Sequence, residues 1–311
     1  METAQFYFKA MIDFAQYWAD VRLEVLSGDR DWDRMPRQQT VQANGGVWRL
    51  DWIRHSSADD SLMWGWWAYP IDRAPNGACM LWLPGYSYGT PPADSTCLIP
   101  GVCTFCLNVH GKMPDEPYVN PAGREDYILQ GIDTPVSYIY RRISLACLAA
   151  VDVALAQPET NVDRLVVGGM SQGGGLAIIV AANSNAPALC FADMPFLSDV
   201  RETLKTSSSP IYKSVRNFHG HDGKRAQAIS DVLSLFDPLN HAPNVHIPTW
   251  MSVGGRDPSV KRSAVERVFN ALGSHIKHLE FFEAAGHEFR PEMNLVHTQW
   301  INEMVINSKV A

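Results

Sequence analysis

A serine lies at the centre of the segment Gly-Met-Ser-Gln-Gly, which matches the G-x-S-x-G motif of serine hydrolases. An apolar run precedes this Ser171 and a helical pattern follows it, which is the context of a nucleophile elbow. Gly169 and Gly173 let the strand and the helix approach without Cβ clashes. We therefore predict that Ser171 is a catalytic nucleophile. The backbone N–H of Gln172, at the start of the helix, is predicted to be one donor of an oxyanion hole.

A serine hydroxyl is a weak nucleophile until a base removes its proton, so a histidine and an orienting acid must complete the site. In hydrolases with this motif the acid follows the serine and the base follows the acid. Asp257 lies in the turn Gly-Gly-Arg-Asp-Pro directly after an apolar run, and it is the predicted acid. Asp193, which follows the preceding apolar run, is the alternative. Among ten histidines, His287 is the predicted base because its Gly-His-Glu loop directly follows the last predicted strand.

Two other groups of residues are of the types that bind metals. His219 and His221 lie two residues apart, but they lack a third anchor in the pattern of a zinc site. Cys103 and Cys106 have no second cysteine pair and lie inside an apolar run, so they are interpreted as strand residues. We therefore predict no metal and no cofactor.

The elements that must position these residues follow a repeated strand-and-helix pattern. Helical spacing of apolar residues predicts helices over about 5–26, 138–157 and 172–182. Two aromatic-rich segments predict early antiparallel strands, and six apolar runs ending in glycine or polar turns predict buried parallel strands. The antiparallel pair is predicted over 47–53 and 62–69, and the parallel strands over 78–83, 102–109, 165–167, 188–192, 249–253 and 279–283.

This order predicts an α/β-hydrolase fold, in which a mostly parallel twisted sheet is flanked by helices. Residues 1–311 are expected to form a single domain, because no repeat or long polar linker divides the chain. Polar helical pieces over about 196–245 interrupt the pattern before the acid-bearing strand. This insertion is predicted to be a small cap over the active site, although its composition equally describes a connector.

Composition narrows the class of partner. The chain of 311 residues is 46% hydrophobic and 19% charged, and its formal charge of −7 argues against binding nucleic acid or an anionic membrane surface. No run of about 18 apolar residues and no signal peptide pattern is present, so a cytoplasmic location is expected. The six cysteines lie in apolar runs and are predicted to be buried thiols. A small neutral or cationic substrate fits this composition.

The same residues resemble a known family, the acetyl xylan esterases and cephalosporin-C deacetylases of carbohydrate esterase family seven. The likeness extends over nearly the whole chain and is carried by several short segments in one order. These are Trp18 to Asp20, Gly85-Tyr86, Tyr138 to Arg142, Gly168 to Gly174, Asp193 to Leu197 and Gly286 to Glu288.

The resemblance implies a serine esterase that removes acetyl groups from short xylo-oligosaccharides or from cephalosporin C. It implies that the backbone N–H of Tyr86 is the second oxyanion donor, in agreement with the donor expected from the loop after an early strand. It also implies a homo-oligomer, a hexamer whose active sites face an internal cavity. Where the family carries Arg-Gly-Gln, this chain has His110-Gly111-Lys112, so the following loop, Lys112 to Asp133, must be anchored differently.

Two alternatives stay open at this point. One is another hydrolase of the same fold, such as a longer-chain esterase or a peptidase. The other is a scaffold that binds or assembles without catalysis, which the presence of a serine, an acid and a base argues against.

Overall fold

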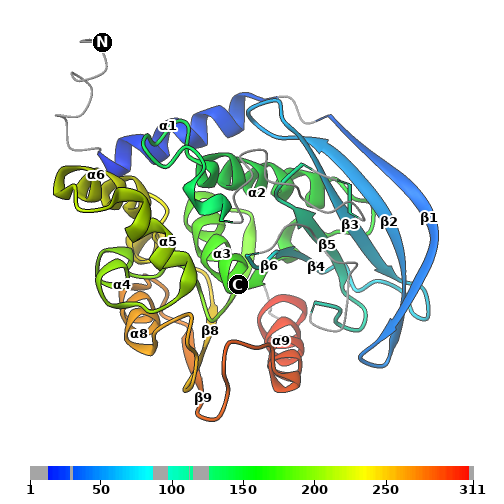
Figure 1. Ribbon diagram of the computed structural model, residues 1–311. Helices are drawn as coiled ribbons and strands as arrows, with labels where there is room; N and C mark the ends of the chain where they lie inside the picture. Colours follow the sequence, from blue (N-terminus) through cyan, green and yellow to red (C-terminus); the bar gives the residue numbers. More distant parts are fainter. Residues whose placement is uncertain (1–12, 29–30, 87–96, 112, 115–125, 308–311) are drawn as a thin grey trace.

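The computed structural model describes residues 13–28, 31–86, 97–111, 113–114 and 126–307. Within these residues nine strands form a single sheet in the order β1-β2-β3-β5-β4-β6-β7-β8-β9 (Figure 1). The strands are β1 (Trp32–Ala43), β2 (Gly46–Ser56), β3 (Leu62–Pro70), β4 (Cys79–Leu83), β5 (Cys103–Asn108), β6 (Leu165–Met170), β7 (Pro187–Asp193), β8 (Thr249–Gly254) and β9 (Lys277–Phe282).

The sheet has an antiparallel part and a parallel part. β1, β2, β3 and β5 pair antiparallel, whereas β5, β4, β6, β7, β8 and β9 pair parallel. Every residue of β4, β5 and β8 is buried, which explains why their sequences are mostly apolar. Because these six parallel strands run in the same direction, their carboxyl ends meet at one edge of the sheet.

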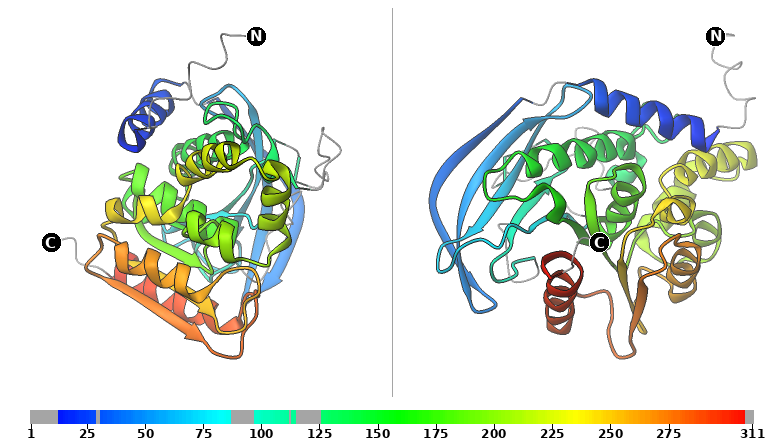
Figure 2. Two further views of the ribbon diagram at one scale, coloured as in Figure 1. Left: turned by 60° about the vertical axis from the view of Figure 1, so that its left-hand side comes forward. Right: turned by 180° about the vertical axis from the view of Figure 1, so that it is seen from behind.

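Helices cover both faces of the sheet (Figures 1 and 2). The first face is packed by α1, α2, α3, α8 and the insertion, whose apolar side chains form one core. The second face is covered by α9 and the short π-helical segment after it, which pack on a separate core with many tryptophans. The helices are α1 (Phe14–Ser27), α2 (Ile139–Leu155), α3 (Gln172–Asn183), α4 (Val200–Thr206), α5 (Pro210–His219), α6 (Gly223–Ser234), α7 (Pro238–His241), α8 (Arg262–Ala271) and α9 (Pro291–Ile301).

The α/β-hydrolase fold predicted from the sequence is confirmed, and each predicted strand and helix has a counterpart in the structure. The predicted N-terminal helix is observed from Phe14, and residues 5–12 of that prediction lie outside the described residues. The insertion over 196–245 contains four short helices, as its polar helical pieces predicted. All six cysteines are buried and none forms a disulfide.

Strand β1 was not predicted. Its side chains are only partly buried or exposed, so it lacks the apolar run that identifies the inner strands. It also contains Pro36, and its register shifts between Met35 and Gln39. Proline is tolerated at a sheet edge because the missing N–H would not pair there. This strand is held by its long hairpin with β2 rather than by burial.

Helix α1 is fastened to the rest of the protein through two buried rings. Trp18 donates its indole N–H to the carbonyl of Leu235, 2.9 Å away, and its ring meets His241 edge to face. The Nε2 of His241 lies 3.0 Å from the same carbonyl, and its Nδ1 lies 3.1 Å from the amide nitrogen of Asn183. An amide N–H facing Nδ1 and a carbonyl facing Nε2 are satisfied by the neutral imidazole. Figures 1 and 2 show that α1 lies along the molecule between the β1–β2 hairpin and α6.

The burial of His241 predicts a dependence of stability on acid. Burial lowers the pKa of His241 from 6.5 to about 3. Below pH 6.5 the unfolded chain therefore binds a proton at His241 that the native state does not bind. The free energy of unfolding consequently falls as pH falls. We expect this residue to contribute up to about 1.4 kcal/mol per pH unit between pH 6 and 4. Urea unfolding of wild type and His241→Gln at several pH values measures this slope.

The exposed His246 offers a matched control. His246→Gln is expected to retain the wild-type slope, whereas His241→Gln is expected to flatten it. Equal slopes in wild type and His241→Gln would contradict the prediction.

Candidate active site

Ser171 occupies a strained turn between β6 and α3. Its backbone angles are φ 59° and ψ −120°, in a region that residues with a Cβ seldom adopt. Three backbone hydrogen bonds hold this conformation. The N–H of Ser171 donates to the carbonyl of Asp193 at 2.8 Å, and its carbonyl accepts from Phe196 at 2.9 Å and from Gly175 at 3.1 Å. The turn is therefore fixed by the segment that follows β7 as well as by its own helix.

Two glycines of the motif are required by close backbone contacts. A Cβ on Gly169 would lie 2.5 Å from the carbonyl carbon of Gly173. A Cβ on Gly173 would lie 2.0 Å from the carbonyl oxygen of Leu83, at the end of β4. Helix α3 thus starts directly against β4 and β6, which places Ser171 at the carboxyl edge of the sheet.

The predicted acid and base lie together at the same edge. The turns after β8 and β9 are joined by backbone hydrogen bonds of 2.9 Å from Gly255 to Phe282 and from Arg256 to Ala285. Across these turns, Nδ1 of His287 lies 2.6 Å from Oδ2 of Asp257.

The environment of this pair orients both members. The Asp257 side chain is fully buried, and its other oxygen accepts the N–H groups of Ser259 at 2.7 Å and Val260 at 2.9 Å. The His287 side chain keeps 22% of its surface exposed. Because both oxygens of the buried carboxylate accept hydrogen bonds, the carboxylate holds the imidazole through Nδ1. Nε2 of the same ring then remains for proton transfer.

Asp193, the alternative acid, has different partners. Its Oδ1 accepts the hydroxyl of Ser252 at 2.8 Å, and its Oδ2 lies 3.3 Å from Nε2 of His297. Both side chains are fully buried, and the imidazole stacks on Phe191 with ring centroids 4.0 Å apart. Among the described residues there are therefore two aspartate–histidine pairs, one at the surface of the sheet edge and one beneath the nucleophile. Sequence reasoning missed His297, because nothing in the pattern of α9 distinguishes it.

The two predicted oxyanion residues lie on neighbouring elements. β4 pairs with β6 so that Leu83 lies opposite Gly169, and Tyr86 follows β4 as Gln172 follows β6. The Gln172 side chain is buried and accepts hydrogen bonds from the hydroxyls of Tyr127 and Tyr140. No pattern in the sequence pointed to Tyr127, and Tyr140 occurred only within a segment of the family resemblance.

His110 is buried at the end of β5, where the resemblance placed a departure from its family pattern. Its carbonyl accepts a hydrogen bond from Arg142 at 3.3 Å, and its ring meets Tyr127 edge to face at 4.5 Å. Lys112, and most of the loop predicted to run to Asp133, lie outside the described residues. The histidine thus contacts the same tyrosine that contacts Gln172.

Comparison with known families decides where this chain belongs. The family model described as acetyl xylan esterase (AXE1) matches residues 8–304. The chain belongs to this family.

Individual relatives agree with this placement. The acetyl esterase Axe7A of Xylanibacter ruminicola is 25% identical over 199 residues, which cover 61% of this chain and 43% of that protein. The match thus spans less than half of that relative. The acetyl xylan esterase from Paenibacillus sp. R4 superposes with a TM-score of 0.80 at 22% identity, covering 95% of this chain and 96% of that one. The acetyl xylan esterase 1 from Thermoanaerobacterium sp. JW/SL YS485 gives 0.80 at 19% identity, with 94% of each chain covered. The two structures share the fold.

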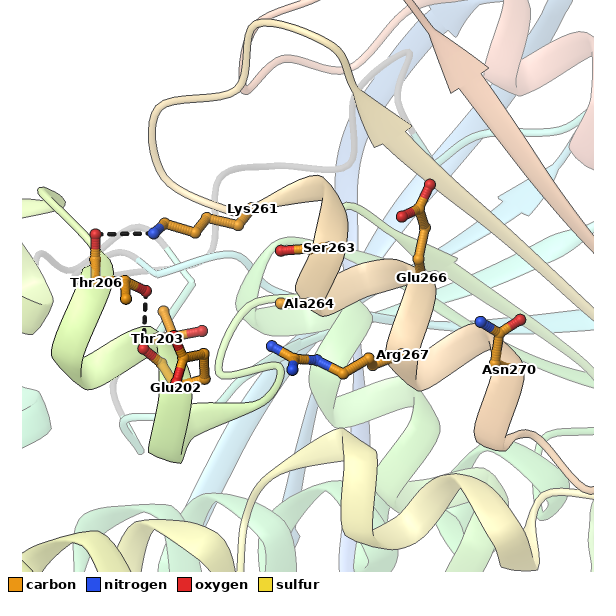
Figure 3. A pocket seen from close by; sticks show the side chains of 9 residues that line it. All are labelled: Glu202, Thr203, Thr206, Lys261, Ser263, Ala264, Glu266, Arg267 and Asn270. Carbon is orange, nitrogen blue, oxygen red and sulfur yellow. Dashed lines mark hydrogen bonds between the residues drawn. The ribbon is translucent and has the colours of Figure 1, made fainter.

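In this acetyl xylan esterase family member, a polar groove of about 460 Å³ lies between α4 and α8 (Figure 3). Lys261 donates to the carbonyl of Thr206 at 2.8 Å, and Arg267 is paired with Asp199. Both cations are therefore already engaged, and none of the predicted catalytic residues lines the groove. The lining residues are Glu202, Thr203, Thr206, Lys261, Ser263, Ala264, Glu266, Arg267 and Asn270.

Among the residues that the structure describes, no three His, Cys, Asp or Glu side chains gather as a metal-binding cluster. His219, one of the two histidines considered as ligands, directs its Nδ1 to the carbonyl of Gly220, 2.9 Å away. In the same described ranges, no helix is both long enough and apolar enough to cross a membrane.

The buried pair beneath the nucleophile predicts a cost in stability. His297→Phe keeps an aromatic ring against Phe191 but leaves the buried Asp193 carboxyl without its histidine. We expect the free energy of unfolding to fall by about 3 kcal/mol, measured by urea unfolding at pH 7.

His278 supplies a control with the same chemistry at the surface, because its side chain is 50% exposed and lies 3.0 Å from Glu280. His278→Phe is expected to change the free energy of unfolding by less than about 1 kcal/mol. Equal decreases in the free energy of unfolding of His297→Phe and His278→Phe would mean that the contact between His297 and Asp193 does not stabilise the protein.

Proposed function

We propose that this protein is a serine carboxylesterase that removes acetyl or other short acyl groups from small acylated sugars or cephalosporin-C-like esters. The observation that carries the proposal is the 2.6 Å contact between His287 and the buried Asp257, at the sheet edge where the strained Ser171 lies. Membership of the acetyl xylan esterase family supports an ester as the substrate. The acetyl esterase of Xylanibacter ruminicola supports acetyl as the acyl group.

The reaction proceeds in two steps. His287 takes the proton of the Ser171 hydroxyl through Nε2, while Asp257 at Nδ1 orients the ring and stabilises its positive charge. The serine oxygen attacks the ester carbonyl, and the N–H groups of Gln172 and Tyr86 bind the oxyanion. His287 then returns the proton to the leaving alcohol. A water molecule, activated by the same histidine, hydrolyses the acyl-serine and restores the enzyme.

Several further properties belong to this proposal. Residues 1–311 form one domain, which the continuity of the sheet supports. The insertion over 196–245 is a cap, which its four helices between β7 and β8 support. Six buried free thiols support a reducing compartment such as the cytoplasm. We also propose that the protein is a homo-oligomer, a hexamer by the family resemblance. The proposed reaction needs no cofactor.

Ser171→Ala is expected to abolish hydrolysis of 4-nitrophenyl acetate and labelling by a fluorophosphonate probe, because the attacking oxygen is lost. Asp257→Asn is expected to lower kcat by about 10³-fold to 10⁴-fold, because the imidazole loses its orienting charge. Steady-state kinetics and gel fluorescence measure both effects. Full turnover by purified Ser171→Ala would refute the mechanism, and a wild type that is neither labelled nor active would favour a non-catalytic scaffold.

The acyl preference is tested with nitrophenyl esters from acetyl to octanoyl, beside acetylated xylo-oligosaccharides, cephalosporin C and a peptide substrate. We expect kcat/KM to be highest for acetyl and to fall with chain length. A maximum at octanoyl would indicate a longer-chain esterase, and cleavage of the peptide in preference to acetate esters would indicate a peptidase.

A further inference from the structure

The two proposed oxyanion donors, Gln172 and Tyr86, share a set of buried partners that the reaction itself does not explain. The carboxamide oxygen of Gln172 accepts two hydrogen bonds, from the hydroxyl of Tyr127 at 2.8 Å and from that of Tyr140 at 2.7 Å. A carbonyl oxygen has two lone pairs, so both are used. The amide nitrogen lies 3.4 Å from the carbonyls of Pro84 and Gly85. The side chain of one donor residue thus reaches the backbone directly before the other.

Tyr86 is held by the same part of the chain. Its hydroxyl accepts the backbone N–H of Ile128 at 3.1 Å, and its ring stacks on Tyr127 with centroids 4.1 Å apart and planes 13° from parallel. Ile128 and Tyr127 belong to one short 3₁₀ turn, Tyr127–Leu129. This turn therefore contacts Gln172 through a hydroxyl and Tyr86 through a ring and a backbone N–H.

The tyrosines that hold Gln172 are themselves fixed. Tyr127 and Tyr140 are buried, and Tyr140 lies in the first turn of α2. Burial raises the pKa of Tyr140 well above its ordinary value, so its hydroxyl keeps its proton and donates. The turn is joined to α2 by a 3.0 Å hydrogen bond from Ile139 to Gln130. The partners of the two donor residues thus form one continuous buried unit.

We propose that Tyr127 and Tyr140 are positioning residues that set the distance between the two oxyanion donors. Neither tyrosine touches the reacting atoms. Their hydroxyls hold Gln172, and the Tyr127 ring holds Tyr86, so an N–H at the start of α3 and an N–H after β4 point at one site. An oxyanion donor acts only within about 3 Å of the developing charge, and a misplacement of about 1 Å lowers the rate about 100-fold. This inference rests on the proposed function and deepens it.

The decisive variants remove single hydroxyls and keep the rings. Tyr127→Phe and Tyr140→Phe are each expected to lower kcat for 4-nitrophenyl acetate about 10-fold, and the double variant about 100-fold, because the two donors shift relative to each other. KM is expected to change less than about threefold, since the ground-state carbonyl is bound less strongly by the hole than the oxyanion. The pH at which kcat/KM is half-maximal should stay constant, because His287 and Asp257 are untouched.

Tyr138 supplies a matched control on the same segment. It is buried and stacks against Tyr140, and within the described residues its hydroxyl has no hydrogen-bond partner. Tyr138→Phe is therefore expected to leave kcat unchanged. Inhibition by phenylboronic acid, which forms a tetrahedral adduct with a catalytic serine, provides a second readout. Its affinity should fall in parallel with kcat/KM in the Tyr127 and Tyr140 variants, while thermal unfolding confirms that they are folded.

The outcomes separate the two proposals. Wild-type hydrolysis together with unchanged kcat and boronate affinity in Tyr127→Phe and Tyr140→Phe would overturn the positioning role alone. A rise in KM with kcat unchanged would also overturn it. A wild type that neither hydrolyses the ester nor reacts with a fluorophosphonate at Ser171 would overturn the proposed function and the positioning role with it.

Discussion

The site depends on the backbone conformation of Ser171. A residue with a side chain is held at a positive φ between a strand and a helix, and this conformation is unfavourable on its own. It persists because Asp193 accepts its N–H and Phe196 donates to its carbonyl. Both partners come from the end of β7 and the segment after it, so the turn is secured by a neighbouring strand. The same arrangement leaves the N–H of Gln172 at the start of α3, where the helix dipole favours negative charge.

The predicted acid and base lie together because the carboxyl ends of parallel strands share one edge. Backbone hydrogen bonds join the turns after β8 and β9, and this brings Asp257 and His287 side by side. The partial exposure of His287 suits its predicted role as the base. The side chains of Asp193 and His297 are both fully buried, so this second aspartate–histidine pair suits a structural role.

Burying polar side chains beneath the carboxyl edge of the sheet is unfavourable unless each one finds a partner. Gln172 meets this requirement with two phenol donors, and Oδ1 of Asp193 meets it with the hydroxyl of Ser252. Such satisfied contacts restrict side chains to one arrangement, which hydrophobic packing alone specifies less strictly. The neutral His241 beneath α1 is another case, in which the surrounding acceptor and donor select one tautomer.

Local sequence by itself determined the identity of the inner strands and of the predicted nucleophile. Continuous apolar runs identify strands buried on both faces, and glycines on both sides of Ser171 are required wherever a strand and a helix meet so closely. β1 was not predicted, because the side chains of this edge strand are not buried and its sequence has no apolar run. The sequence order left Asp193 and Asp257 as competing acids, since both follow apolar strands. Only the tertiary structure decided which aspartate contacts His287, because that contact depends on how the turns after β8 and β9 pack. The contact between Tyr127 and Gln172, which are 45 residues apart in sequence, was also visible only in the tertiary structure. No local sequence pattern predicts a contact between side chains from separate elements.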